Sequence, residues 1–138
     1  MTFPVLTSAT LIDIRNSNIP EEFSEFMSAL DSTHALMIYQ IEDNTMKVFP
    51  VNDKNVYLVR LVLDAQKVEG LSLLICRNMS IRVGTDDAIF ITTPMKIQDN
   101  YYYECYLHES SIGNSTDEFK DKVFEISGIK DVAITQIK

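Results

Sequence analysis

The chain has 138 residues, of which 46% are apolar and 23% charged, a balance typical of one globular domain or of two small fused units. Its 20 acidic and 12 basic residues give a net charge of −8, which disfavours binding to nucleic-acid phosphates and to anionic membranes. The N-terminal segment lacks the pattern of a signal peptide, and no apolar stretch approaches the roughly 20 residues that cross a bilayer. We therefore expect a cytoplasmic protein that has neither a nucleic acid nor a membrane as its partner.

The first 55 residues predict a strand, a helix and a hairpin. The strand is expected at 9–14, and Asn18 and Pro20 suit the cap and the first turn of the helix that follows. Apolar residues at helical spacing predict one apolar face on this helix, made of Ile19, Phe23, Phe26, Met27 and Leu30. Two further apolar segments, 35–41 and 46–51, are separated by a polar turn and indicate a hairpin.

The next part of the chain predicts a second strand, helix and hairpin. The segment 56–64 is apolar on both faces apart from Arg60, which is typical of a central strand covered on both sides. A helix is expected at about 66–77, followed by a hairpin whose arms are 80–83 and 88–93.

The last part predicts a strand, a helix and a final strand. The segment 101–109 alternates, so that one face of the strand carries Tyr101, Tyr103, Cys105 and Leu107. Ser115 is placed to cap the helix, and Gly128 to end it in the left-handed conformation. The buried stripe of this helix is expected to be Phe119, Val123 and Ile126. The final strand is expected at 130–137.

The order of these elements predicts the fold class. Strand, helix and hairpin occur at 9–51 and again at 56–93, which is a weak repeat of pattern. We expect an α+β fold in which an antiparallel sheet of roughly seven or eight strands carries three helices in ferredoxin-like βαββαβ packing. Residues 1–138 would form a single compact domain, with two alternatives. In one, 1–55 is a βαββ extension and 56–138 the ferredoxin-like unit; in the other, two ferredoxin-like halves are fused.

Two segments carry a resemblance to known families. In 83–91, a Gly-x-x-Asp turn runs into an apolar strand, and 119–137 contains a closing helix, the turn Ser-Gly-Ile and a strand. With these segments, residues 56–138 resemble ACT domains and the effector-binding domain of the leucine-responsive regulator family. The resemblance implies a non-enzymatic regulatory module that binds a small effector, such as an amino acid, at the interface of a homo-oligomer. The families have two strands between their helices, whereas this sequence has three candidates.

Four residues are candidate contacts for such an effector. In the turn, the amides near Gly84 would hold a carboxylate, and Asp86 and Asp87 would hold an ammonium group. A solvated hairpin turn is the alternative explanation for the two acids. Arg60 would hold a ligand carboxylate; the alternatives are that it pairs with an acid of the fold or lies near a sheet edge.

The sequence offers no recognisable catalytic or metal-binding constellation. Cys105 and His108, three residues apart on a strand, point to opposite faces and cannot hold one metal ion together. We expect no enzyme activity, no metal, no cofactor, and reduced thiols at Cys76 and Cys105. The alternative function is a protein for assembly or scaffolding, since the element order also resembles the roadblock/profilin-like scaffold. Such a protein would use a tyrosine-rich surface at 101–106 or a strand edge and bind no ligand.

Overall fold

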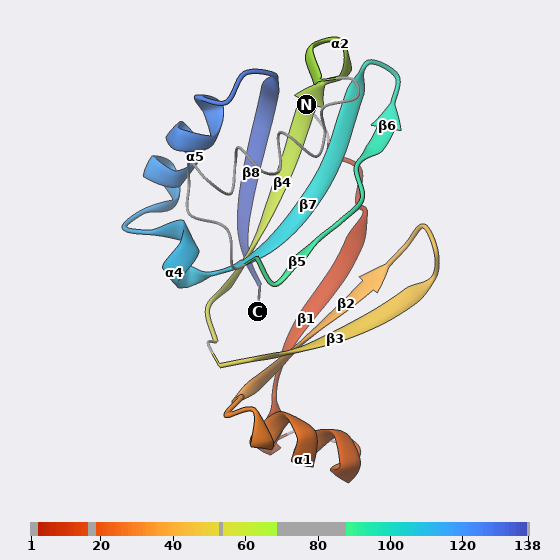
Figure 1. Cartoon of the computed structure of the whole chain (residues 1–138), viewed down its shortest axis with the longest axis vertical. Helices are drawn as coiled ribbons and strands as arrows, with labels where there is room; N and C mark the ends of the chain where they lie inside the picture. The colour runs from red at the N-terminus through yellow and green to blue at the C-terminus, as the bar shows by residue number, and fades with distance from the viewer. Residues whose placement is uncertain (1–2, 17–18, 53, 69–87, 138) are drawn as a thin grey trace. The chain divides into compact units, whose positions relative to one another are not determined.

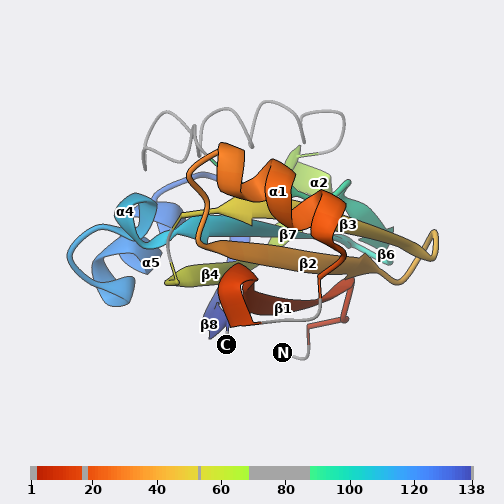
Figure 2. The same ribbon diagram turned by 90° about the horizontal axis from the view of Figure 1, so that it is seen from below.

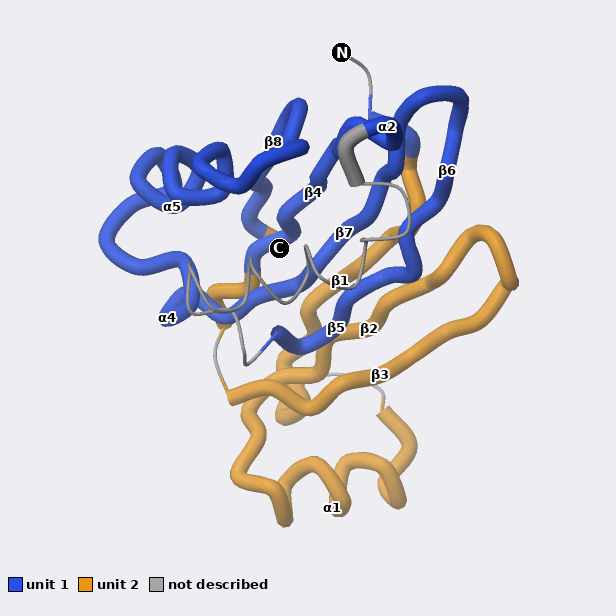
Figure 3. Tube along the Cα trace, turned by 45° about the horizontal axis from the view of Figure 1, so that its top comes forward, with its two compact units in different colours: residues 1–4, 57–136 blue, residues 5–56, 137–138 orange. Residues whose placement is uncertain are grey.

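The computed structural model of the chain describes residues 3–16, 19–52, 54–68 and 88–137 (Figure 1). The chain divides into two compact units, which Figure 3 shows in different colours. Unit 1 comprises residues 1–4 and 57–136, and unit 2 comprises residues 5–56 and 137–138. None of the helices in the described residues has the length and the apolar character needed to cross a membrane.

Unit 2 contains a three-stranded antiparallel sheet in the order β1-β2-β3 and one longer helix. Its elements are β1 (Thr7–Asp13), the 3-10 helix η1 (Ile14–Asn16), α1 (Glu21–Ala29), β2 (His34–Gln40) and β3 (Thr45–Val51). The predicted strand, helix and hairpin of this region are therefore confirmed, with boundaries that shift by one or two residues. The helix α1 lies beside the end of the sheet at which β1 ends and β2 begins (Figure 1, Figure 2).

The start of α1 differs from the prediction. The helix begins at Glu21 with Pro20 in the cap position, so no side chain caps it, and Asn18 lies outside the described residues. The fixed φ of proline and the acidic first turn, Glu21 and Glu22, favour the helix start instead. The helix stops before Asp31, whose φ of 56° is left-handed and cannot continue a right-handed helix.

Unit 1 contains a second sheet, in which β5, β7, β4 and β8 are neighbours in that order and β6 also pairs with β7. Its elements are β4 (Val56–Asp64), α2 (Ala65–Val68), β5 (Phe90–Ile91), β6 (Met95–Ile97), β7 (Asn100–His108), α4 (Glu109–Ile112), α5 (Thr116–Phe124) and β8 (Ile129–Ile137). The α+β class with antiparallel sheets is confirmed, but the single sheet that we predicted is wrong. The strand β4, apolar on both faces, takes the centre of a second sheet and does not extend the β2–β3 hairpin.

The predicted helix at 66–77 and hairpin at 80–93 are described only in part. The helix is seen over its first turn as α2, and the rest of it, together with the arm at 80–83, lies outside the described residues. The arm expected at 88–93 is shorter than predicted, because β5 covers Phe90–Ile91 alone.

The strands β5 and β6 lie one after the other along β7. Phe90 pairs with Tyr106, whereas Met95 pairs with Tyr102, so the register slips by one residue between the two strands. Pro94 lies at this slip, and its lack of an N–H group accounts for the interruption of the ladder.

The helix α5 covers one face of this sheet, as its sequence predicts. The Ser115 side chain accepts a hydrogen bond from the Glu118 N–H, and Gly128 adopts a φ of 97°. The stripe Phe119, Val123 and Ile126 packs with buried residues of the neighbouring strands: Val59, Leu61, Leu63, Tyr103, Cys105, Leu107 and Val132. The predicted facing of the β7 side chains, including the buried thiol-bearing Cys105, is thereby confirmed.

Candidate functional site

The apolar face of α1 is mostly exposed. The side chains of Phe26, Leu30 and Phe23 are 75%, 63% and 59% exposed, whereas Met27 is only 8% exposed. Met27 is the residue of this helix that reaches the small core of unit 2, beside Ile14 and Ala35. The apolar face of the helix therefore stays largely open to solvent, and Met27 is the buried side chain that anchors the helix.

The sheet presents a mainly apolar face, which Thr10 and Ser8 of β1 interrupt. Because side chains alternate along a strand, the pairing between strands places them in rows across the sheet. From the end nearest α1, the rows are Ile12, Ala35 and Pro50; Thr10, Met37 and Val48; and Ser8, Tyr39 and Met46. The opposite face of β2 is closed, since Leu36 and Ile38 are fully buried.

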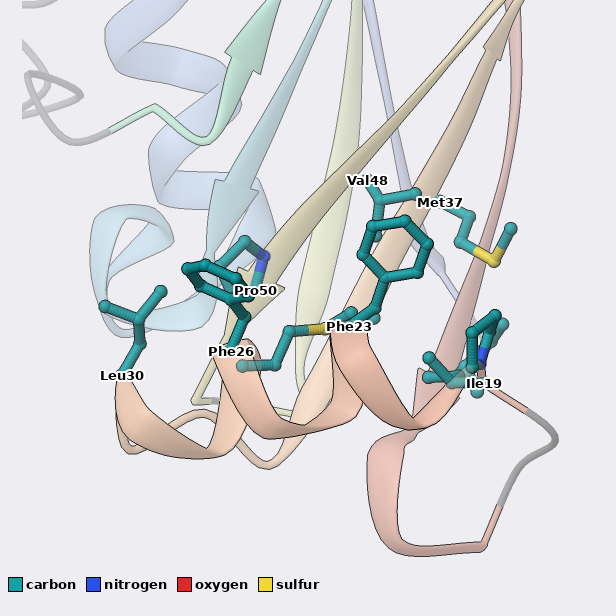
Figure 4. Close-up of a pocket in the computed structure, with 11 residues that line it drawn as sticks. Ile19, Phe23, Phe26, Leu30, Met37, Val48 and Pro50 are labelled. Atoms are coloured by element: carbon teal, nitrogen blue, oxygen red, sulfur yellow. The ribbon is translucent and has the colours of Figure 1, made fainter.

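A groove of about 610 Å³ lies between α1 and the first two rows. Figure 4 shows Phe23, Phe26 and Leu30 projecting from α1 toward side chains of the sheet. The groove is lined by apolar side chains throughout: Ile12, Ile19, Pro20, Phe23, Phe26, Met27, Leu30, Ala35, Met37, Val48 and Pro50. Its volume is within the range of roughly 300–1,000 Å³ that is usual for ligand sites.

The chemistry of the groove is that of binding an apolar group. None of the described residues that line it has an ionisable side chain, so these residues offer no nucleophile and no general acid or base. A free amino acid would bring an ammonium and a carboxylate group that find no charged or polar side chain among them. An occupant with apolar side chains or alkyl groups would instead remove Phe23, Phe26 and Leu30 from water.

The apolar surface extends beyond the groove along the β2–β3 hairpin. Met46 is 61% exposed in the third row, next to Tyr39, whose hydroxyl donates a hydrogen bond to the side-chain oxygen of Asn44 in the turn. Val48, in the second row, is exposed and joins the groove to this outer part. The exposed apolar surface is therefore longer than the pocket alone.

The polar side of α1 is acidic. Glu21, Glu22 and Glu25 lie on the helix, Asp31 follows it directly, and all four are exposed. The segment 16–46, which contains all of α1 and β2, has six acidic residues and no Lys or Arg. The groove is thus an apolar site beside a negatively charged helix.

Arg15, the basic residue that lies nearest to α1 in the sequence, forms an ion pair with Asp13. Arg15 Nη2 lies 3.1 Å from Asp13 Oδ2, and Nε and the backbone N–H of Arg15 both donate to Oδ1 of the same carboxylate. These hydrogen bonds from Arg15 lower the pKa of Asp13 and raise the pKa of Arg15.

None of the residues predicted as effector contacts is among the described residues that line this groove. Gly84, Asp86 and Asp87 lie outside the described residues. Arg60 lies on β4 in unit 1, where its Nε is 3.0 Å from Oε2 of Glu104 on β7. Arg60 therefore pairs with an acidic residue of the fold, which was one of the alternatives predicted for it. Within the described ranges, no group of three or more His, Cys, Asp or Glu side chains is placed to hold a metal ion.

The sequence did contain a signal for the groove. The helical repeat that ends in Phe26, Met27 and Leu30 predicts one apolar face, and such a face usually packs on a core. One further feature sets this helix apart, which is its position in a segment, 16–46, that lacks basic residues. An apolar face in such a segment is a candidate surface for a partner.

Comparison of the chain with models of protein families, with curated proteins and with solved structures found no match.

Proposed function

We propose that the chain is a non-enzymatic binding module for protein assembly, and that the groove of unit 2 holds an apolar segment of a partner protein. The observation that carries this proposal is the exposed apolar face of α1, with Phe26 at 75% exposure opposite an apolar sheet face. Burying such side chains contributes about 1.5–3 kcal/mol each, so a segment that covers several of them would bind measurably.

The shape of the apolar surface favours a polypeptide over a small molecule. Pockets for small ligands usually enclose most of the ligand, whereas Phe23, Phe26 and Leu30 stand largely open to solvent. The surface also continues from the groove to Val48 and Met46 on the hairpin, as an elongated partner would require. A helix that binds in a groove contacts it with apolar side chains at positions i, i+3 or i+4, and i+7. Such a row of apolar side chains could fill this elongated apolar groove.

The test is a selection of random peptides of about 14 residues, roughly four helical turns, against the whole chain. We expect peptides with helically spaced apolar residues to be enriched. They should bind the unaltered chain and lose binding to Phe26→Asp and Val48→Asp, which change exposed side chains of the groove. The matched control is Phe124→Asp, which changes an exposed aromatic on α5 in unit 1. Equal binding to all variants, or a failure to enrich any peptide, would refute the proposal.

Unit 1 supports a second candidate, the effector-binding module implied by the resemblance of residues 56–138. Its strand order β5-β7-β4-β8, with β5 and β6 in line along β7 as one interrupted strand, supports ferredoxin-like packing. The candidate contacts remain Gly84, Asp86, Asp87 and Arg60, and the module would act as a homo-oligomer.

Thermal melting against the twenty amino acids tests this second candidate. A ligand at 100 times its dissociation constant adds about 2.7 kcal/mol to the free energy of unfolding, which shifts the melting temperature by several degrees. A shift that is lost in Arg60→Met would support the effector module. A panel without shifts would exclude amino acids as its ligands.

A further inference from the structure

The charges on α1 and directly after it have one sign. Three Lys or Arg residues belong to the described part of unit 2: Arg15, Lys47 and Lys54. Arg15 is paired with Asp13, and Lys47 alternates with the groove residue Val48 and so lies on the other face of β3. Lys54, beyond the end of β3, is one base against the four acids of α1 and its C-terminal end. The side chains at the groove and around α1 therefore create a negative potential.

The stability of α1 does not explain all of its acids. Glu21 and Glu22 are in the first turn, where the helix dipole stabilises them. Asp31 follows the C-terminal end, where the dipole disfavours a negative charge, and the last turn has no basic residue. The C-terminal end of α1 thus carries a negative charge that no basic residue of the helix offsets, beside the exposed side chain of Leu30.

From this charge we propose that the segment held in the groove is a cationic amphipathic helix, an inference that rests on the proposed function. Its apolar residues would contact Phe23, Phe26 and Leu30, and its Lys or Arg residues would flank that face near Glu22 and Asp31. Because α1 has nine residues, a rise of about 1.5 Å per residue gives a groove of roughly 13–14 Å, long enough for two to three turns of partner helix.

A second copy of this chain fits the groove less well. It would bring its own α1 with Glu21, Glu22 and Glu25, so that like charges would face each other across a symmetric interface. The same negative potential opposes fatty acids and anionic lipids, whose charge has the same sign.

The first part of the test compares three peptides with one apolar face, Leu at i, i+3, i+4 and i+7, and with Lys, Gln or Glu at the flanking positions. We expect the Lys peptide to bind the whole chain about tenfold more tightly than the Glu peptide at low ionic strength, with the Gln peptide between them. In about 1 M salt, where the Debye length is about 3 Å, the three affinities should converge to within about threefold.

The second part separates local charge from the net charge of −8. Neutralising α1 with Glu22→Gln, Glu25→Gln and Asp31→Asn should weaken the Lys peptide about fivefold and leave the Gln peptide unchanged. Asn suits the left-handed backbone at position 31, where φ is 56°. The control removes the same amount of charge from exposed positions of α5, with Asp117→Asn, Glu118→Gln and Asp121→Asn, and should change the affinity less than about twofold.

The outcomes distinguish the two proposals. Equal affinities for the three peptides, all lost in Phe26→Asp, would overturn the cationic partner and keep the groove as a protein-binding site. If the α1 and α5 variants weakened binding of the Lys peptide equally, the cationic partner would also be overturned. The attraction would then come from the net charge of the chain and not from the acids of α1. Absence of binding by all three peptides would overturn both proposals. A dimer in light scattering that Phe26→Asp dissociates would assign the groove to a second copy, and displacement of the Lys peptide by neutral lipid vesicles would assign it to a membrane.

Discussion

Arg60 and Glu104 form an ion pair across two neighbouring strands of unit 1, with Nε of Arg60 3.0 Å from Oε2 of Glu104. The side chain of Glu104 is 1% exposed, whereas that of Arg60 is 27% exposed. The backbone of Glu104 is also fixed, since its N–H donates to Oγ1 of Thr92 at 2.9 Å and its carbonyl accepts from the Thr92 N–H. The two charges therefore differ in their access to water.

This difference predicts unequal effects of removing each partner. Arg60→Met removes the base that faces the buried carboxylate of Glu104 and should lower the free energy of unfolding by about 3–5 kcal/mol. Glu104→Gln leaves an arginine that reaches solvent and should cost about 1–3 kcal/mol. The double variant should lose less than the sum, as urea denaturation of all four proteins would measure. Equal or additive losses would contradict this account, and a negligible loss in Arg60→Met would favour a ligand role for Arg60.

Adjacent residues of α1 should differ strongly in their importance for stability. Met27→Ala removes the buried anchor of the helix and should cost about 2–5 kcal/mol. Phe26→Ala changes an exposed side chain and should alter the free energy of unfolding by no more than about 0.5 kcal/mol. Denaturation in urea measures both. A large loss in Phe26→Ala would mean that this face is covered in solution.

The pair Asp13–Arg15 predicts an effect of pH. Hydrogen bonds from Arg15 lower the pKa of Asp13 from its ordinary value of 3.8, so the folded chain holds the ionised form more strongly than the unfolded chain does. The stabilisation is present above pH 3.8 and is lost as the pH falls through the lowered pKa. NMR titration of the Asp13 carboxyl carbon should show the lowered pKa, and Arg15→Gln should raise it. An unchanged titration in Arg15→Gln would contradict the role of the arginine.

The cap of α5 should contribute measurably to stability. Ser115 Oγ accepts a hydrogen bond of 3.0 Å from the Glu118 N–H, so Ser115→Ala should cost about 1 kcal/mol. Ser127→Ala, an exposed position beyond the same helix, is the matched control and should be close to neutral. Comparison of the two midpoints of thermal unfolding checks the prediction, which fails if the two variants melt together.

Local signals made α5 and its surroundings predictable. The cap at Ser115, the stripe with Phe119 and the left-handed Gly128 each depend on residues within one or two turns, and all three are confirmed. The alternation in β7 likewise predicted which side chains meet α5. The sequence left open whether the strands form one sheet or divide between two, because strand pairing is decided between distant segments.

The groove, too, could not be predicted from local sequence signals alone. Periodicity identified Phe23 and Phe26 as members of one apolar face, but periodicity is the same whether a core or solvent lies opposite. Whether such a face is covered depends on how closely the helix approaches the sheet, which is a tertiary property. The candidate contacts Gly84, Asp86, Asp87 and Arg60 were chosen from a resemblance confined to residues 56–138, and so they could not point to unit 2.

The single anchor of α1 also has a consequence for the kinetics of the helix. A helix that loses only the burial of Met27 when it detaches can open locally at a small fraction of the cost of global unfolding. Its amide protons should then exchange with solvent faster than those of β2, whose Leu36 and Ile38 are fully buried. An occupant that covers Phe23, Phe26 and Leu30 would slow this exchange in proportion to its concentration, so the folding of α1 itself would report how much of the groove is filled.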